Sequence, residues 1–162
     1  MEKGISAFTA AMHDLQQRDR RIRPLVVGAG PAAHAFDGLA GAILTGHLSG
    51  PALATAIASA DIMFCPSTTE TFGNVLLEAM ACGLPIVSAD AQNARSILKH
   101  GEDSLICALS DPCAYGDALA RLSGNEALRR AMGSAARRNS LGKSWDAESE
   151  KVLQVYRNVL GR

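Results

Sequence analysis

The sequence predicts an α/β fold in which helices cover both faces of a doubly wound parallel sheet. Short apolar segments alternate with longer segments of helical periodicity along the chain, an order that is typical of parallel sheets. The apolar segments are continuous rather than alternating with polar residues, which indicates strands buried on both faces. No repeat, low-complexity stretch or linker interrupts the 162 residues, so we expect one domain over residues 1–162.

The first half of the chain begins with a helix and then alternates strands with helices. Phe8, Met12 and Leu15 recur at helical spacing and define an amphipathic first helix. Gly83 and Pro85 end the last helix of this half, because glycine favours the left-handed C-terminal conformation and proline cannot continue a helix. The predicted elements are a helix over 3–18, strands over 23–27 and 42–45, a helix over 51–59, a strand over 62–65 and a helix over 73–82.

The second half continues the alternation and ends in helices. Asn125 and the pair Asp111 and Pro112 are typical of helix starts, so we expect one helix to begin at each place. The predicted elements are strands over 85–88 and 105–107, a helical turn over 94–98, the two capped helices and a last helix over 145–160. The stripe of that last helix expected to face inward is formed by Val152, Val155, Tyr156 and Val159.

Composition excludes several function classes. The 16 basic and 16 acidic residues sum to zero, which gives no electrostatic reason to expect a nucleic acid or an anionic membrane as partner. No apolar stretch is long enough to span a membrane, and the start MEKGISAF lacks the apolar run of a signal peptide. Cys65 and Cys107 lie in apolar segments and are interpreted as reduced core residues of a cytoplasmic protein, and no C-x-x-C pair favours a metal site.

The loops after the predicted strands carry the residues that could bind a ligand. Ligands of doubly wound sheets bind outside the carboxyl ends of the strands. Glycine and small polar residues, which let backbone approach a ligand closely, gather at 28–31, 46–47, 66–72 and 89–95. We therefore expect a binding site at this edge of the sheet.

The densest pattern is a pair of glutamates around the start of helix 73–82. Glu70 precedes the helix, and Glu78 follows Asn74 by four residues and so shares its face. The free N–H groups at 72–75 form a positive terminus suited to a phosphate or a sugar oxygen, and carboxylates beside it suit the hydroxyls of a neutral polyol. The spacing alone leaves a second interpretation open, in which both glutamates only stabilise the helix dipole.

The segment DIMFCPSTTETFGNVLLEAMACGLPIVS, residues 61–88, resembles the donor-binding segment of retaining GT-B glycosyltransferases of group 1, glycosyltransferase family 4. The signature of that family is two glutamates eight residues apart, the second opening the pattern Glu-Ala-Met-Ala-x-Gly-x-Pro, which is matched here by Glu70 and by residues 78–85. The residues T-E-T-F-G-N-V at 69–75 most resemble the same segment of bacterial enzymes that use GDP-mannose or a similar nucleotide-hexose to glycosylate lipids. Further matches are E-K-G at 2–4, V-G-x-G-P at 27–31, T-G-H-L-S at 45–49, S-W-D at 144–146 and Tyr156.

The resemblance implies a Rossmann-like domain, the C-terminal half of a GT-B fold, that binds a GDP- or UDP-linked hexose and supports retaining hexosyl transfer. By position, the candidate catalytic residues are Glu70, which would bind hydroxyls of the donor sugar, and Lys3, which would neutralise the diphosphate leaving group. Glu78 would bind the ribose hydroxyls. The other candidate donor-binding residues are Phe72, Gly73, Asn74 and Val75 beside the sugar and phosphate, Gly28 and Gly30 beside the phosphate, and Gly46, His47 and Leu48 beside the base. No Asp-x-Asp pair is present, so neither a metal nor a cofactor is expected.

The chain departs from the family in three ways. Loop 91–96 lacks the usual Gly-Gly pair, and Arg95 in it is either a new phosphate or acceptor contact or a surface helix residue. The acceptor-binding N-terminal domain is missing from this chain, and any peripheral association with a membrane is expected only through that missing half. The strand that usually ends before E-K-G is also missing, so we expect the sheet to lack its central first strand.

The same residues also bear on alternative functions. A nucleotide-sugar-binding domain without turnover of its own, vestigial or complemented in trans, remains open. The Glu70 and Glu78 pair disfavours a non-hydrolysing sugar epimerase of similar architecture. The pair Gly28 and Gly30 lacks the third glycine of the dinucleotide fingerprint, which disfavours a dinucleotide-binding fold.

Overall fold

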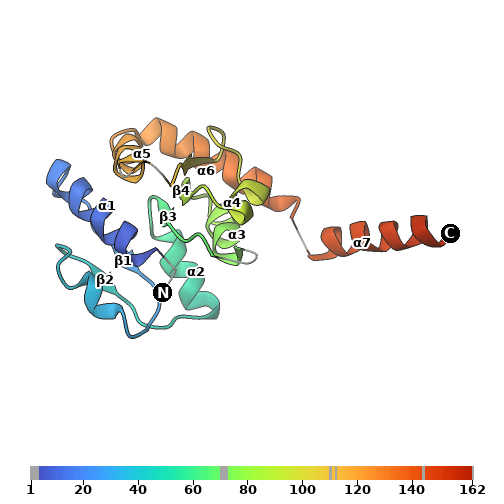
Figure 1. The fold of residues 1–162 in the computed structure, drawn as a ribbon, viewed down its shortest axis with the longest axis horizontal. Coiled ribbons are helices and arrows are strands. Elements are labelled where there is room, and N and C mark those ends of the chain that lie inside the picture. The colour runs from blue at the N-terminus through green and yellow to red at the C-terminus, as the bar shows by residue number, and fades with distance from the viewer. Residues whose placement is uncertain (1–3, 70–72, 110, 112, 144, 162) are drawn as a thin grey trace.

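The computed structural model describes residues 4–69, 73–109, 111, 113–143 and 145–161. Strands and helices alternate along the chain as predicted, with one additional 3₁₀ helix, η1 (Figure 1). The elements are α1 (Ile5–Arg18), β1 (Leu25–Val26), η1 (Ala33–Phe36), β2 (Ile43–Leu44), α2 (Gly50–Ala58), β3 (Met63–Cys65), α3 (Asn74–Ala81), β4 (Ile86–Ala89), α4 (Gln92–Ile97), β5 (Ser104–Cys107), α5 (Ala114–Ser123), α6 (Glu126–Leu141) and α7 (Trp145–Leu160).

The strands form two parallel ladders. β1 pairs with β2, and β4 pairs with β3 on one side and with β5 on the other. Within the described part of the chain, β1 and β3 do not pair with each other. This division agrees with the expectation that a central strand is missing from these residues, since such a strand would join the two ladders into one doubly wound sheet.

The strand β4 divides the core into two layers. Ile86 packs in one cluster with residues of α3, and Val87 packs in a second cluster with residues of α1 and α5. Successive side chains of a strand point to opposite faces, and all four residues of β4 are buried. The predicted burial of continuous apolar strands on both faces is therefore confirmed for β4.

An aromatic cluster joins α1 to β3 and to η1. The ring of Phe8 on α1 stacks on Phe64 of β3 with ring centroids 5.4 Å apart. The same ring meets the edge of Phe36 in η1 at 5.7 Å. Phe8 thus packs against β3 and against the segment that connects β1 with β2.

Local polar groups fix the helix starts near the predicted positions. The Asn125 side chain accepts a hydrogen bond from the backbone N–H of Leu128 at 2.9 Å and caps α6, as predicted. Asp111 accepts from the N–H of Cys113 at 2.9 Å, just ahead of α5. Both contacts pair backbone donors that have no partner inside the helix.

The predicted orientation of the last helix is wrong. Val152, Val155, Tyr156 and Val159 are all exposed, and Figure 1 shows α7 lying apart from the other helices. The periodic pattern correctly predicts an amphipathic helix. It does not identify a surface to cover the apolar stripe, and these four side chains stay exposed among the residues that the structure describes.

Candidate functional site

The loops after β1 and β2 meet, as the sequence analysis expects for two neighbouring strand ends. The N–H of Gly28 donates to the carbonyl oxygen of Gly46 at 2.8 Å. Both residues have positive φ angles, 137° and 71°, which side chains other than glycine rarely adopt. Gly28 and the predicted site residues Gly30 and His47 are exposed, and Leu48 is half-buried. The predicted phosphate and base loops are thus adjacent and accessible to a ligand.

The start of α1 lies against the end of β3. A Cβ atom on Gly4 would fall 2.5 Å from the carbonyl oxygen of Pro66, which directly follows β3. The chain segments that lead to the predicted catalytic residues therefore converge at the carboxyl end of β3. Lys3 and Glu70 themselves, and the predicted donor-binding residue Phe72, lie outside the described residues.

The start of α3 presents free backbone donors. Gly73 precedes the helix with a left-handed φ of 81°, and no side chain caps α3. The unpaired N–H groups of the first turn give this helix end a partial positive charge. An anionic or hydroxyl oxygen placed there would satisfy them.

The face of α3 beside this terminus is the predicted one. Asn74 and Glu78 are exposed, whereas the other side of the helix is buried. The buried stripe is formed by Leu76, Ala79 and Met80, with Val75 half-buried. A carboxylate and an amide therefore stand four residues apart on an open face, about one helical turn from the N-terminus.

The start of α4, which follows β4, lies close to the start of α3, a relationship that sequence reasoning missed. The Asn93 side-chain nitrogen lies 3.2 Å from the position that a Cβ atom on Gly73 would take. Ser67, in the loop after the neighbouring β3, is only 5% exposed, and its hydroxyl has no hydrogen-bond partner among the described residues. The placement of both residues after adjacent strands was the only sequence signal that could have pointed to them.

Arg95 lies on the surface with a protein partner, in agreement with its interpretation as a surface helix residue. Its guanidinium binds both carboxylate oxygens of Asp90, at 2.5 and 2.6 Å, and its side chain is 68% exposed. The hydrogen bonds from Arg95 lower the pKa of Asp90 below its ordinary value. This pair joins the end of β4 to α4.

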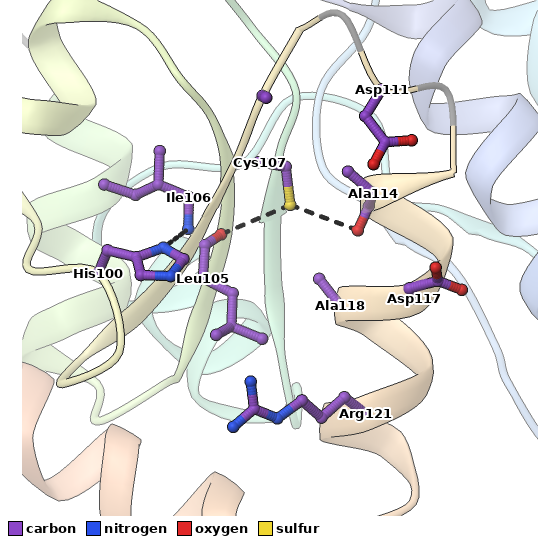
Figure 2. A pocket seen from close by; sticks show the side chains of 10 residues that line it. His100, Leu105, Ile106, Cys107, Asp111, Ala114, Asp117, Ala118 and Arg121 are labelled. Carbon is purple, nitrogen blue, oxygen red and sulfur yellow. Dashed lines mark hydrogen bonds between the residues drawn. The ribbon is translucent and has the colours of Figure 1, made fainter.

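A shallow pocket lies elsewhere, between β5 and α5. Figure 2 shows His100 beside the strand and Arg121 on the helix across from it. His100 accepts a hydrogen bond from the N–H of Ile106 at 3.0 Å, and Asp117 pairs with Arg18 at 2.7 Å. The volume is about 300 Å³. None of the predicted site residues that the structure describes lines this pocket, so it is separate from the candidate site.

Metal-binding clusters and membrane-spanning helices are both absent from the described residues. Those residues contain no group of three histidine, cysteine or acidic side chains arranged to hold a metal ion. Nor does any helix in the described ranges combine the length and apolar character needed to cross a membrane. Cys65 and Cys107 are buried, which confirms their predicted place in the core.

Comparisons with known proteins place the chain in a family. The family profile described as glycosyl transferases group 1 matches residues 1–125. A GDP-mannose-dependent alpha-mannosyltransferase of Mycolicibacterium smegmatis is 37% identical over 122 residues, which are 75% of this chain and 32% of that protein. A phosphatidyl-myo-inositol mannosyltransferase of Mycobacterium tuberculosis is 31% identical over 172 residues, covering 98% of this chain and 44% of that protein.

The fold is shared with solved glycosyltransferases. The crystal structure of WaaG, a glycosyltransferase involved in lipopolysaccharide biosynthesis, superposes with a TM-score of 0.77 at 21% identity and covers 95% of this chain and 43% of that protein. The chain thus spans less than half the length of these relatives. It has the α/β fold with parallel strands found in the C-terminal domain of GT-B enzymes, and by its sequence it belongs to the group 1 glycosyl transferases.

Proposed function

We propose that this chain is the donor-binding domain of a retaining hexosyltransferase and binds a nucleotide-diphosphate hexose at the carboxyl ends of β3 and β4. The observation that carries the proposal is the uncapped N-terminus of α3 with the exposed Glu78 one turn further along. Family membership supports it. The mycolicibacterial relative is named a GDP-mannose-dependent alpha-mannosyltransferase, and this name also supports it. The donor would be GDP- or UDP-linked.

The geometry suggests how each part would act on such a donor. Glu78 would accept hydrogen bonds from the ribose hydroxyls, each worth about 1.5–3 kcal/mol when one partner is charged. The N–H groups at the start of α3 would face the diphosphate. As the anomeric C–O bond breaks through an oxocarbenium-like state, negative charge grows on the diphosphate, and fixed donors at that place stabilise it.

Two further residues have roles in the proposed mechanism that rest on the sequence alone. Lys3 would add a positive charge beside the leaving group, and Glu70 would bind hydroxyls of the hexose. The contact of Gly4 with Pro66 supports this pairing, because it joins the segment after Lys3 to the segment before Glu70. The acceptor would bind on a partner domain of similar size.

Calorimetry on the full chain tests the proposal. Glu78→Gln should weaken binding of GDP and of GDP-mannose by roughly 1–2 kcal/mol, through loss of charge-assisted hydrogen bonds. Glu70→Gln should spare GDP and weaken only GDP-mannose. The same measurements with UDP and a UDP-hexose test the uridine-linked donors.

A matched control and a contradicting result complete the design. Glu126→Gln alters an exposed glutamate on α6 and should change neither affinity. Equal losses for the Glu70 and Glu78 variants with plain nucleotide would contradict the assigned roles. A wild-type chain that binds none of the four ligands would overturn the proposed function.

A second candidate is a nucleotide-sugar-binding domain without turnover of its own. It rests on the same uncapped start of α3 and exposed Glu78, which would support binding of a donor whether or not transfer follows. Adding a separately made acceptor-binding domain and measuring sugar transfer separates the candidates. Transfer above that of either part alone supports the enzyme, whereas tight donor binding with no transfer supports the binding domain.

A further inference from the structure

The side chain of Asn93 has no role in the proposed function as stated above, yet it lies at the start of α3. Its nitrogen is 3.2 Å from the Cβ position of Gly73, and Ile97 and Leu76 flank the same position at 3.3 Å. Asn93 is half-buried. Its backbone carbonyl accepts a hydrogen bond from Ser96 at 2.7 Å, but its carboxamide has no partner among the described residues.

A second polar group near the same strand ends is also unpaired. The Ser67 hydroxyl, 5% exposed, has no partner in the described part of the chain. Ser67 follows β3 and Asn93 follows β4, and these strands are paired through Cys65 and Ser88. Buried polar groups without partners cost free energy. One such buried hydroxyl after β3 and the half-buried, unpaired carboxamide of Asn93 beside the uncapped start of α3 indicate a polar ligand at this edge.

The ion pair at the start of α4 carries no net charge that would oppose an anionic ligand. Asp90 would repel a phosphate by itself, but its carboxylate is held by Arg95 through two hydrogen bonds. The same pair fixes the start of α4, where Asn93 stands. The carboxamide therefore presents a neutral N–H donor next to the positive end of α3.

We infer that Asn93 is a donor-site residue whose carboxamide donates a hydrogen bond to the terminal phosphate of the nucleoside diphosphate. This inference rests on the proposed function, since it assigns one more contact within the same donor site. It predicts that the residue discriminates between nucleotides with one phosphate and those with two.

Calorimetry with GMP, GDP and GDP-mannose on the full chain tests the inference, with the uridine series run in parallel. Asn93→Ala should leave GMP binding unchanged and weaken GDP and GDP-mannose about tenfold, the effect of one hydrogen bond to a charged group. The isosteric Asn93→Asp should weaken both diphosphates further, because a carboxylate repels them. Gln92→Ala, at an exposed neighbour on α4, is the matched control and should change nothing.

The outcomes separate a failure of the proposed function from a failure of the Asn93 assignment. If the wild-type chain binds no nucleotide, the proposed function fails and this inference fails with it. If the wild type binds GDP and both Asn93 variants bind it equally well, only the inference is overturned. A loss confined to GDP-mannose would assign the contact to the sugar and overturn the phosphate assignment. If Asn93→Ala lowers the unfolding temperature, the isosteric aspartate variant carries the test.

Discussion

Gly4 packs on Pro66 so closely that a Cβ atom on Gly4 would lie 2.5 Å from the Pro66 carbonyl oxygen. Real Cβ atoms do not approach backbone oxygens to that distance, and Gly4 also has a φ angle of 70°. Together with the stacking of Phe8 on Phe64, this contact places the start of α1 against the end of β3. It lies at the edge of the proposed donor site.

Gly4→Ala should destabilise the chain by about 1–3 kcal/mol, because it combines a steric clash with a strained backbone conformation. Urea unfolding measures the change. Gly142→Ala is the matched control, since Gly142 follows α6 with a φ angle of −84° and a Cβ atom there would meet nothing within 4 Å. Its effect should stay within about 0.5 kcal/mol. Equal stability of the two variants would show that the Gly4 contact is not tight.

Much of this architecture could be predicted from the sequence because its signals are local. The helical spacing of Phe8, Met12 and Leu15 predicts α1, and the four-residue spacing of Asn74 and Glu78 predicts their common face. These relationships depend only on the geometry of one helix. They hold in the structure.

The rest depends on contacts between distant segments. The apolar stripe of α7, which includes Val155, predicts a buried face, but no local rule identifies what would cover it. Asn93 lies near Gly73 because the starts of α3 and α4 converge after the neighbouring strands β3 and β4, and this requires the strand register. The break between β1 and β3 agrees with the missing central strand, but that expectation comes from the family resemblance, because periodicity does not encode strand pairing.

Acid should remove the contribution of the Asp90 and Arg95 pair to stability. The hydrogen bonds from Arg95 hold the folded-state pKa of Asp90 below its ordinary value of 3.8. A group whose pKa is lowered by folding contributes stability above its unfolded pKa and loses it as the pH falls through the folded pKa. Asp90→Asn should thus be less stable than wild type at neutral pH and approach it below pH 3.8.

Urea unfolding over a pH series measures this difference, and Arg95→Met in the same series gives the coupling between the two side chains. The effect should shrink with added salt, because the pair is exposed to solvent. A stability difference that stays constant from neutral pH into acid would contradict a role for the charged form of Asp90.

The cysteines should differ in reactivity. Burial, with a smaller contribution from Asp111, raises the pKa of Cys107 to about 11, and its thiol donates a hydrogen bond to the carbonyl oxygen of Ala114 at 3.5 Å. The thiolate is the reactive form, so iodoacetamide at neutral pH should alkylate the exposed Cys113 first and Cys107 far more slowly. Peptide mapping by mass spectrometry follows both. Comparable rates in the folded chain would be inconsistent with the buried position of Cys107, whereas comparable rates in urea are expected.

Hydrogen exchange should separate the two ladders. β4 has a partner strand on each side, and its residues are buried, so the amide of Val87 should exchange among the slowest. The Ile43 amide also has a partner, the carbonyl oxygen of Pro24 at 2.9 Å. Its ladder, however, is only two residues long per strand, and the side chains of Ile43 and Leu44 are 56% and 40% exposed.

Amide protection reflects the free energy of the opening reaction that exposes the group. Opening of the β1 and β2 ladder breaks few hydrogen bonds and exposes little additional apolar surface, so the Ile43 amide should exchange well before that of Val87. Nuclear magnetic resonance of the amides gives both rates in one sample. If the two amides were equally protected, the ladders would open as one cooperative unit, and the break between β1 and β3 would carry no energetic consequence.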